Sequence, residues 1–163
     1  MLWWTLRQLG SKNPKKRHMA VQKLGETKDP RAVESLIAAL KDDCEEVRHS
    51  AVCALAKLGD NRAIKPLVAA LKDAKIYIRN AATKSLEKIG GAQAIDPLVE
   101  TLKDEDANAR TAAVEVLARI GGERAVDPLI GALEDSEERV QAAAANALAQ
   151  IGDARAIDPL VMA

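Results

Sequence analysis

The sequence contains very few aromatic residues and cysteines, and it carries no excess of charge of either sign. Its 163 residues include no phenylalanine, one tyrosine, two tryptophans and two cysteines. Lysine plus arginine and aspartate plus glutamate number 24 each, so the formal net charge is zero. A protein that binds nucleic acid through its phosphates is expected to have a basic excess. We therefore expect no nucleic-acid partner, and we interpret the basic run Lys12–His18 as a solvated helix start.

Motifs that carry chemistry are equally scarce. Cys44 and Cys53 lie nine residues apart on one predicted helix. At a rise of about 1.5 Å per residue they are too far apart to form a disulfide. The sequence has no CxxC motif or Cys/His cluster, no Ser/His/Asp set and no Gly-rich phosphate loop. We expect no catalytic residue, no metal and no cofactor, and the unpaired cysteines favour a cytoplasmic location.

No segment approaches the roughly 20 apolar residues of a membrane-spanning helix. The N-terminal stretch MLWWTLRQL lacks the basic start, long apolar core and cleavage signal of a secretory leader. We expect no membrane partner.

Alanine, leucine, isoleucine and valine supply most of the apolar residues, with many charged residues between them, and this mixture favours helices. One phrase recurs every 31 residues: RAIKPLVAA, QAIDPLVET, RAVDPLIGA and RAIDPLVMA. The same step links Ala20, Ala51, Ala82, Ala113 and Ala144; Leu24, Leu55, Leu86, Leu117 and Leu148; Ala32, Ala63, Ala94, Ala125 and Ala156; and Leu36, Leu67, Leu98, Leu129 and Leu160. A fixed period of this length is typical of a solenoid.

Each repeat contains two helical patterns, which we call helix A and helix B. The apolar stripe consists of Val33, Leu36, Ile37 and Leu40 in helix A and of Val47, Ala51, Leu55 and Leu58 in helix B. The pairs Asp96-Pro97, Asp127-Pro128 and Asp158-Pro159 predict that aspartate caps helix A and proline takes its first position. The phrase before each pair is then a separate turn or an earlier helical turn kinked at the proline. After helix B, Gly59, Gly90, Gly121 and Gly152 predict a left-handed C-terminal turn.

One repeat alone buries too little apolar surface to offset the entropy of ordering its residues, so each must pack against a neighbour. We predict an all-α, right-handed α-α superhelix (an α-solenoid) of about five 31-residue repeats in one domain, residues 1–163. The units are approximately 1–28, 29–59, 60–90, 91–121 and 122–152, with a partial unit 153–163.

An aspartate between the two helices and an arginine six residues later recur together along the chain. These residues are Asp42, Arg48, Asp73, Arg79, Asp104 and Arg110. Such a carboxylate and guanidinium at one level of a stack can form a ladder, in which each arginine reaches its own aspartate and a neighbour's. We interpret this set as structural.

The proline-containing helix A, the aspartate, the arginine six residues on and the Ala/Leu-rich helix B resemble HEAT repeats. The short period and the pattern RAIDPLV…LKDED…R..A…L..IG are most similar to the HEAT-like repeats named after phycobilisome lyases. The resemblance implies a binding scaffold, with a few enzymatic relatives. Deoxyhypusine hydroxylase holds iron through paired His-Glu motifs, and neither His18 nor His49 is followed by glutamate, so we reject that activity. An accessory or lyase-type subunit that handles a bilin or similar prosthetic group stays an alternative.

Comparison of the repeats shows where the helix B residues vary, and the resemblance places this strip in the inner groove of the superhelix. The alternative is that these are solvated positions free to drift. The candidate partner-binding residues are His49, Cys53, Lys57, Tyr77, Asn80, Lys84, Lys88, Thr111, Glu115 and Arg119. Lys57, Lys88 and Arg119 form a basic line that suits an acidic protein surface, and Tyr77 is an isolated aromatic anchor. We predict a non-catalytic scaffold for a protein partner; a designed consensus array is a third interpretation.

The two ends of the sequence both match helix A. Ile157, Leu160 and Val161 form an apolar stripe with no following helix B to cover it. We expect the chain either to be a segment of a longer array or to associate end to end with another copy. Alternatively, Trp3 and Trp4 form a hydrophobic cap on the first helix B.

Overall fold

The computed structural model describes residues 2–162 and divides into two compact units, Met1–Ile89 and Gly90–Ala163. All regular elements in the described residues are helical, which confirms the predicted all-α repeat solenoid. The expectation that residues 1–163 act as one domain stays a prediction. No helix among the described residues is both long enough and apolar enough to span a bilayer.

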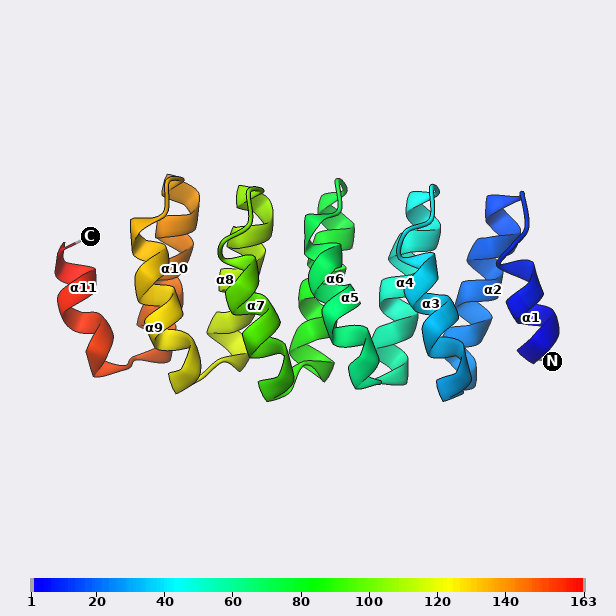
Figure 1. Ribbon diagram of the computed structural model, residues 1–163, viewed down its shortest axis with the longest axis horizontal. Coiled ribbons are helices and arrows are strands. Elements are labelled where there is room, and N and C mark those ends of the chain that lie inside the picture. The colour runs from blue at the N-terminus through cyan, green and yellow to red at the C-terminus, as the bar shows by residue number, and fades with distance from the viewer. Residues whose placement is uncertain (1, 163) are drawn as a thin grey trace. The chain divides into compact units, whose positions relative to one another are not determined.

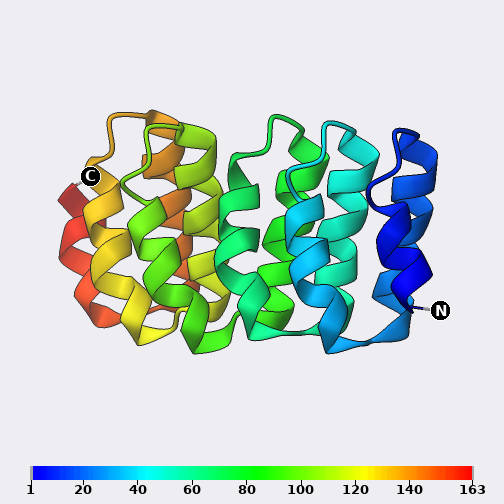
Figure 2. The same cartoon turned by 45° about the vertical axis from the view of Figure 1, so that its right-hand side comes forward.

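The first unit alternates short and long helices. Its elements are α1 (Leu2–Gln8), α2 (Pro14–Thr27), η1 (Pro30–Ala32), α3 (Val33–Ala39), α4 (Glu45–Leu58), η2 (Asn61–Ala63), α5 (Ile64–Ala69), η3 (Ala70–Lys72) and α6 (Ile76–Ile89). The short helices α1, α3 and α5 form one layer, and the long helices α2, α4 and α6 form the second (Figures 1 and 2). The short helices are the predicted A helices and the long ones the B helices.

The second unit repeats this arrangement. Its elements are η4 (Gly91–Ala94), α7 (Ile95–Thr101), α8 (Ala107–Ile120), α9 (Glu123–Gly131), η5 (Ala132–Glu134), α10 (Glu138–Ile151), η6 (Ala154–Ala156) and α11 (Ile157–Met162). The B helices α8 and α10 pack side by side, and the A helices α7 and α9 cover them.

The core consists of the residues that recur at the 31-residue step. All members of both alanine series and of the B-helix leucine series are buried. The A-helix leucines are buried as well, except Leu160 in α11, which is partly exposed. The B helices α2 and α4 approach closely at Gly25, where an added Cβ would lie 2.7 Å from the Cβ of Ala54.

The start of helix A differs from the prediction. Asp96 is the second residue of α7, and Pro128 lies inside α9, so the Asp-Pro pairs do not cap their helices. The caps lie earlier: Asp29, Asp60 and Asp153 each accept a hydrogen bond from the backbone N–H two residues on. In those repeats the RA phrase is a separate 3-10 turn, whereas in α9 it continues into the helix. The aspartate two residues before the RA phrase is the cap, because its side chain accepts the backbone N–H of the arginine.

The end of helix B agrees with the prediction in two repeats and differs in two others. Gly59 and Gly152 adopt the left-handed conformation, with φ of 68° and 70°. Gly90 and Gly121 have helical φ, and the positive φ passes to the next residue, Gly91 or Gly122. In these two repeats a second glycine follows, and it takes the positive φ one residue later, although all four B helices end at equivalent positions.

Candidate interaction surface on the B helices

The first unit has an open hollow between the B helices α4 and α6, with a volume of about 530 Å³. Its lining residues are His49, Cys53 and Ala56 from α4 and Tyr77, Asn80, Ala81, Lys84, Ser85 and Lys88 from α6. The structure therefore brings together six of the ten candidate partner-binding residues. Lys57 is exposed on α4 but is not part of the lining.

Two of the lining residues form an aromatic pair. The rings of His49 and Tyr77 meet edge to face, with centroids 5.4 Å apart. Tyr77 lies at the start of α6, next to an ion pair between Lys75 Nζ and Glu45 Oε2 at 2.7 Å. Burial, followed by the charge of Glu45, raises the pKa of the Tyr77 hydroxyl, so the phenol stays protonated at neutral pH. The pair provides a flat aromatic contact rather than a charged one.

Cys53 lies beside this aromatic pair, with its Sγ 3.9 Å from Nε2 of His49. Burial raises the pKa of the thiol, and Lys57 only partly opposes this effect. Because the thiolate is the reactive form, Cys53 is a weak nucleophile at neutral pH. Cys44, at the start of α4, donates its thiol to Oε2 of Glu46 at 2.8 Å, and this bond raises its pKa too.

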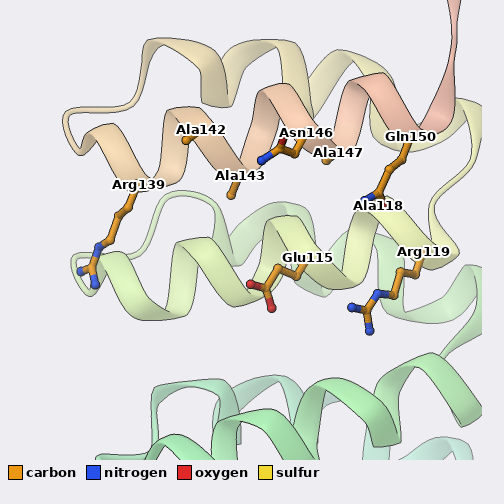
Figure 3. Close-up of a pocket in the computed structure, with 9 residues that line it drawn as sticks. All are labelled: Glu115, Ala118, Arg119, Arg139, Ala142, Ala143, Asn146, Ala147 and Gln150. Atoms are coloured by element: carbon orange, nitrogen blue, oxygen red, sulfur yellow. The ribbon is translucent and has the colours of Figure 1, made fainter.

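The second unit has a matching hollow between α8 and α10, with a volume of about 490 Å³ (Figure 3). Its polar lining consists of Glu115 and Arg119 from α8 and Arg139, Asn146 and Gln150 from α10, and alanines form the rest. Two predicted residues, Glu115 and Arg119, belong to it. Thr111 does not line it, and its hydroxyl donates to the carbonyl of Ala107 within α8 at 2.8 Å.

The candidate set did not include Arg139, Asn146 or Gln150, although Asn146 and Gln150 belong to the same variable series as Lys84 and Lys88. Arg139 occupies the position of Tyr77 two repeats later, and Asn146 and Gln150 occupy the positions of Lys84 and Lys88. Arg139 Nη1 donates to Oδ1 of Asn108, one repeat earlier, at 2.8 Å. Following the series of Tyr77 through every B helix as well would have found Arg139.

The arginine and aspartate residues between the helices form contacts away from the two hollows. Arg48 binds the carboxylate of Asp73 through Nε and Nη2, at 2.7 and 3.2 Å, and donates through Nη1 to the carbonyl of Asp42 at 2.9 Å. Arg110 binds Asp135 and the carbonyl of Asp104 in the same way. Each arginine thus uses the neighbour's carboxylate and the backbone of its own loop. Arg79 bonds the carbonyls of Asp73 and Ala74 in its own loop.

Arg17 makes the equivalent contact in the first repeat, with Nε 2.7 Å from Oδ2 of Asp42. Hydrogen bonds from Arg110 hold the pKa of Asp135 below its ordinary value. For Asp73, burial alone raises the pKa, but the bonds from Arg48 outweigh it and the pKa is lowered. In each of these ion pairs both side chains are largely buried, and none of them lines either of the two B-helix hollows.

The two units are built from one repeated helical hairpin, which defines an αα-repeat protein. The sequence pattern of HEAT repeats matches residues 4–87, 60–118 and 95–163, so the chain belongs to the HEAT-repeat family. Comparison with curated protein sequences found no match.

Solved structures agree with this assignment. The chain is similar to the complex of CpcE and CpcF of phycocyanin lyase from Nostoc sp. PCC7120, with 29% identity and a TM-score of 0.63. That match covers 93% of this chain and 65% of the other, so the chain spans less than two thirds of its length. The resemblance to the HEAT-like repeats of phycobilisome lyases is thereby confirmed.

Two designed armadillo repeat proteins are also similar. One matches at 25% identity with a TM-score of 0.55, over 99% of this chain and 87% of the other. The second, in complex with the peptide (KR)4, matches at 25% identity with a TM-score of 0.51, over the same shares. The helical repeat of this chain suits a protein-interaction scaffold.

Proposed function

We propose that this chain is a non-catalytic scaffold that binds a protein partner along its B helices. The observation that carries the proposal is the recurrence of the hollow between successive B helices in both units. Small residues line both hollows: Ala56 and Ala81 the first, and Ala118 and Ala143 the second. The longer side chains around them differ from repeat to repeat. A repeated fold with different side chains at the same surface position in each repeat can recognise one partner selectively.

The charge of the first hollow favours an acidic partner. No carboxylate is among its described lining residues, while Lys84 and Lys88 are exposed there and Lys57 lies beside it. Tyr77 adds an aromatic contact of the kind that dominates many interfaces. A partner that offers carboxylates around one apolar side chain would match both features.

Affinity capture with two charge-reversed baits tests the proposal. The first bait carries Lys57→Glu, Lys88→Glu and Arg119→Glu on the B helices; the second carries Lys41→Glu, Lys65→Glu and Lys103→Glu, which are exposed residues outside both hollows. Both variants change the net charge equally. We expect a protein captured by the wild type to be lost from the first bait and retained by the second. Equal capture by the two baits would contradict a site on the B helices.

A second function is supported by the 29% identity to the CpcE and CpcF complex of phycocyanin lyase. In this alternative the chain is an accessory or lyase-type subunit that handles a bilin or similar prosthetic group. The raised pKa values of Cys44 and Cys53 favour non-covalent handling over attachment to this chain. Visible absorbance of the purified protein after co-expression with a bilin would support this function, and colourless protein would argue against it.

The free thiols of Cys44 and Cys53 support a cytoplasmic location.

A further inference from the structure

The outer face of the first repeat, formed by α1 and α2, carries lysines where every later repeat carries a small or apolar residue. One repeat apart, the counterparts of Lys16 are Val47, Ile78, Ala109 and Val140, and those of Lys23 are Ala54, Ser85, Val116 and Ala147. All eight counterparts are buried, whereas Lys16 and Lys23 are exposed. These two lysines distinguish the face from the stacking surface of an internal repeat.

The counterpart positions show what such a face normally contacts. Ala54 lies against Gly25 of the preceding B helix, so close that a Cβ on Gly25 would overlap it. By the repeat symmetry, Lys23 and Lys16 point to where a preceding repeat would stack. A repeat stacked there would bury both ammonium groups among apolar atoms, which is strongly unfavourable. The face is therefore unsuited to end-to-end stacking with a second copy.

The same face nevertheless exposes much apolar surface. Trp4 and Met19 are each 55% exposed and Trp3 is 72% exposed. Trp4 and Met19 help to line a hollow of about 270 Å³ between α1 and α2, whose other lining residues are Thr5, Gln8, Lys16, Ala20 and Lys23. Trp4 thus packs toward the first helix B, as a cap would, but more than half of it stays exposed. Lys23 Nζ lies 5.8 Å from the centre of the Trp4 ring, which keeps a cation at the rim.

The lining of this hollow contains two lysines, Lys16 and Lys23, and no carboxylate. Residues 1–25 contain no aspartate or glutamate. Within the described part of the chain, Lys15, Lys16 and Lys23 form no salt bridge. An apolar hollow with a rim of unpaired lysines is complementary to an apolar side chain flanked by carboxylates.

We propose that this α1–α2 face is a second docking site, which takes an acidic segment of a partner protein and receives one large apolar side chain beside Trp4 and Met19. Its carboxylates pair with Lys16 and Lys23. The site is separate from the B-helix hollows and does not depend on their function. A hollow suits an inserted side chain better than a flat anionic membrane, and the lysines exclude a stacked repeat.

Tryptophan fluorescence of the full chain tests this site directly, because its two tryptophans both lie in α1 and Trp4 lines the hollow. The probe is a short acetylated peptide in which one leucine is flanked on both sides by glutamates. We expect saturable changes in emission at low ionic strength. Replacing the leucine by alanine, or the glutamates by lysines, should each weaken binding about tenfold or more.

The matched variants are Lys16→Glu with Lys23→Glu on the face, and Lys57→Glu with Lys88→Glu on the B helices. Both double variants change exposed lysines by the same charge, and circular dichroism checks that each is folded. The first should weaken peptide binding about tenfold and the second less than about twofold. Equal weakening by both variants, or equal binding of the leucine and alanine peptides, would overturn the proposal.

Two further outcomes would replace the proposed partner by another. A concentration-dependent dimer in light scattering that Lys16→Glu with Lys23→Glu abolishes would assign the face to a second copy. An emission change produced by vesicles of equal parts phosphatidylserine and phosphatidylcholine, but not by the peptide, would assign it to a membrane. Either result would overturn the assignment to an acidic protein segment.

Discussion

Arg110 and Asp135 are joined by two parallel hydrogen bonds, although they lie 25 residues apart: Nε and Nη2 of Arg110 each lie 2.8 Å from a carboxylate oxygen of Asp135. Both side chains are only 10% exposed. The third nitrogen of the guanidinium holds the carbonyl of Asp104 at 2.7 Å. One arginine thus ties the start of its own helix, its own loop and the loop of the next repeat together.

We predict that Asp135→Ala lowers the free energy of unfolding by about 1–3 kcal/mol, because it leaves a largely buried guanidinium without its charged partner. The matched control is Asp96→Ala. It breaks the ion pair with Arg124, whose side chains are both exposed, and should cost less than about 1 kcal/mol. Urea unfolding of the two variants measures the difference. Equal losses would mean that the Arg110–Asp135 pair contributes no more than a surface pair.

The aspartates that cap the 3-10 turns predict that the stability of the fold depends on pH. Hydrogen bonds from the side chain and backbone of Arg155 lower the pKa of Asp153 from 3.8 to about 2. Because the folded pKa lies below the unfolded one, the ionised carboxylate stabilises the fold above pH 3.8, and this contribution is lost as the pH falls toward 2. Asp153→Asn keeps a capping acceptor but removes the charge.

The wild type should therefore be more stable than Asp153→Asn at neutral pH, and the two should converge below a pH of about 2, near the folded pKa. Thermal melts at a series of pH values measure this convergence. A stability difference that persists unchanged at the lowest pH would show that the charge of Asp153 is not its source.

The core and the repeat hairpins could be predicted from the sequence because both follow from a strictly periodic apolar pattern. Ala51 and Leu55, for example, are buried because each is one helical turn from the next apolar residue on the same face. The caps could not be assigned in the same way. Asp60 and Asp96 are both plausible caps by residue type, and only the position of the preceding turn decides that Asp60 has this role.

The candidate surface was predictable only in part. His49, Lys84 and Lys88 face a hollow because variable B-helix positions point away from the core. Lys57 is the counterpart of Lys88 and Thr111 that of His49, but neither lines one of the two described hollows, because each hollow forms between particular turns of two helices. The lysines of the α1–α2 face were recognised only when burial of their counterparts was known.

We expect a substitution at Lys28, the residue after α2, to stabilise the protein. Lys28 follows α2 with φ of 51° and ψ of 25°, the conformation that Gly59 and Gly152 adopt after their B helices. A side chain with a Cβ is strained there, and glycine is not. We predict that Lys28→Gly raises the free energy of unfolding by about 0.5–1 kcal/mol, and that Gly59→Ala lowers it by a similar amount or more. Urea unfolding of both variants measures the two effects, and the same sign for both would contradict the argument.

A substitution at Tyr77 tests whether a partner binds in the first hollow. Tyr77 is 41% exposed and its ring meets that of His49 edge to face, so its removal should change stability little. If a partner docks in this hollow, Tyr77→Ala should weaken its binding about tenfold, because an aromatic anchor loses its buried area in the complex. The control is Ile76→Ala, the exposed neighbouring residue that does not line the hollow. Calorimetric titration of a captured partner against both variants measures the effect. Equal affinity of Tyr77→Ala and Ile76→Ala would place the partner elsewhere on the molecule.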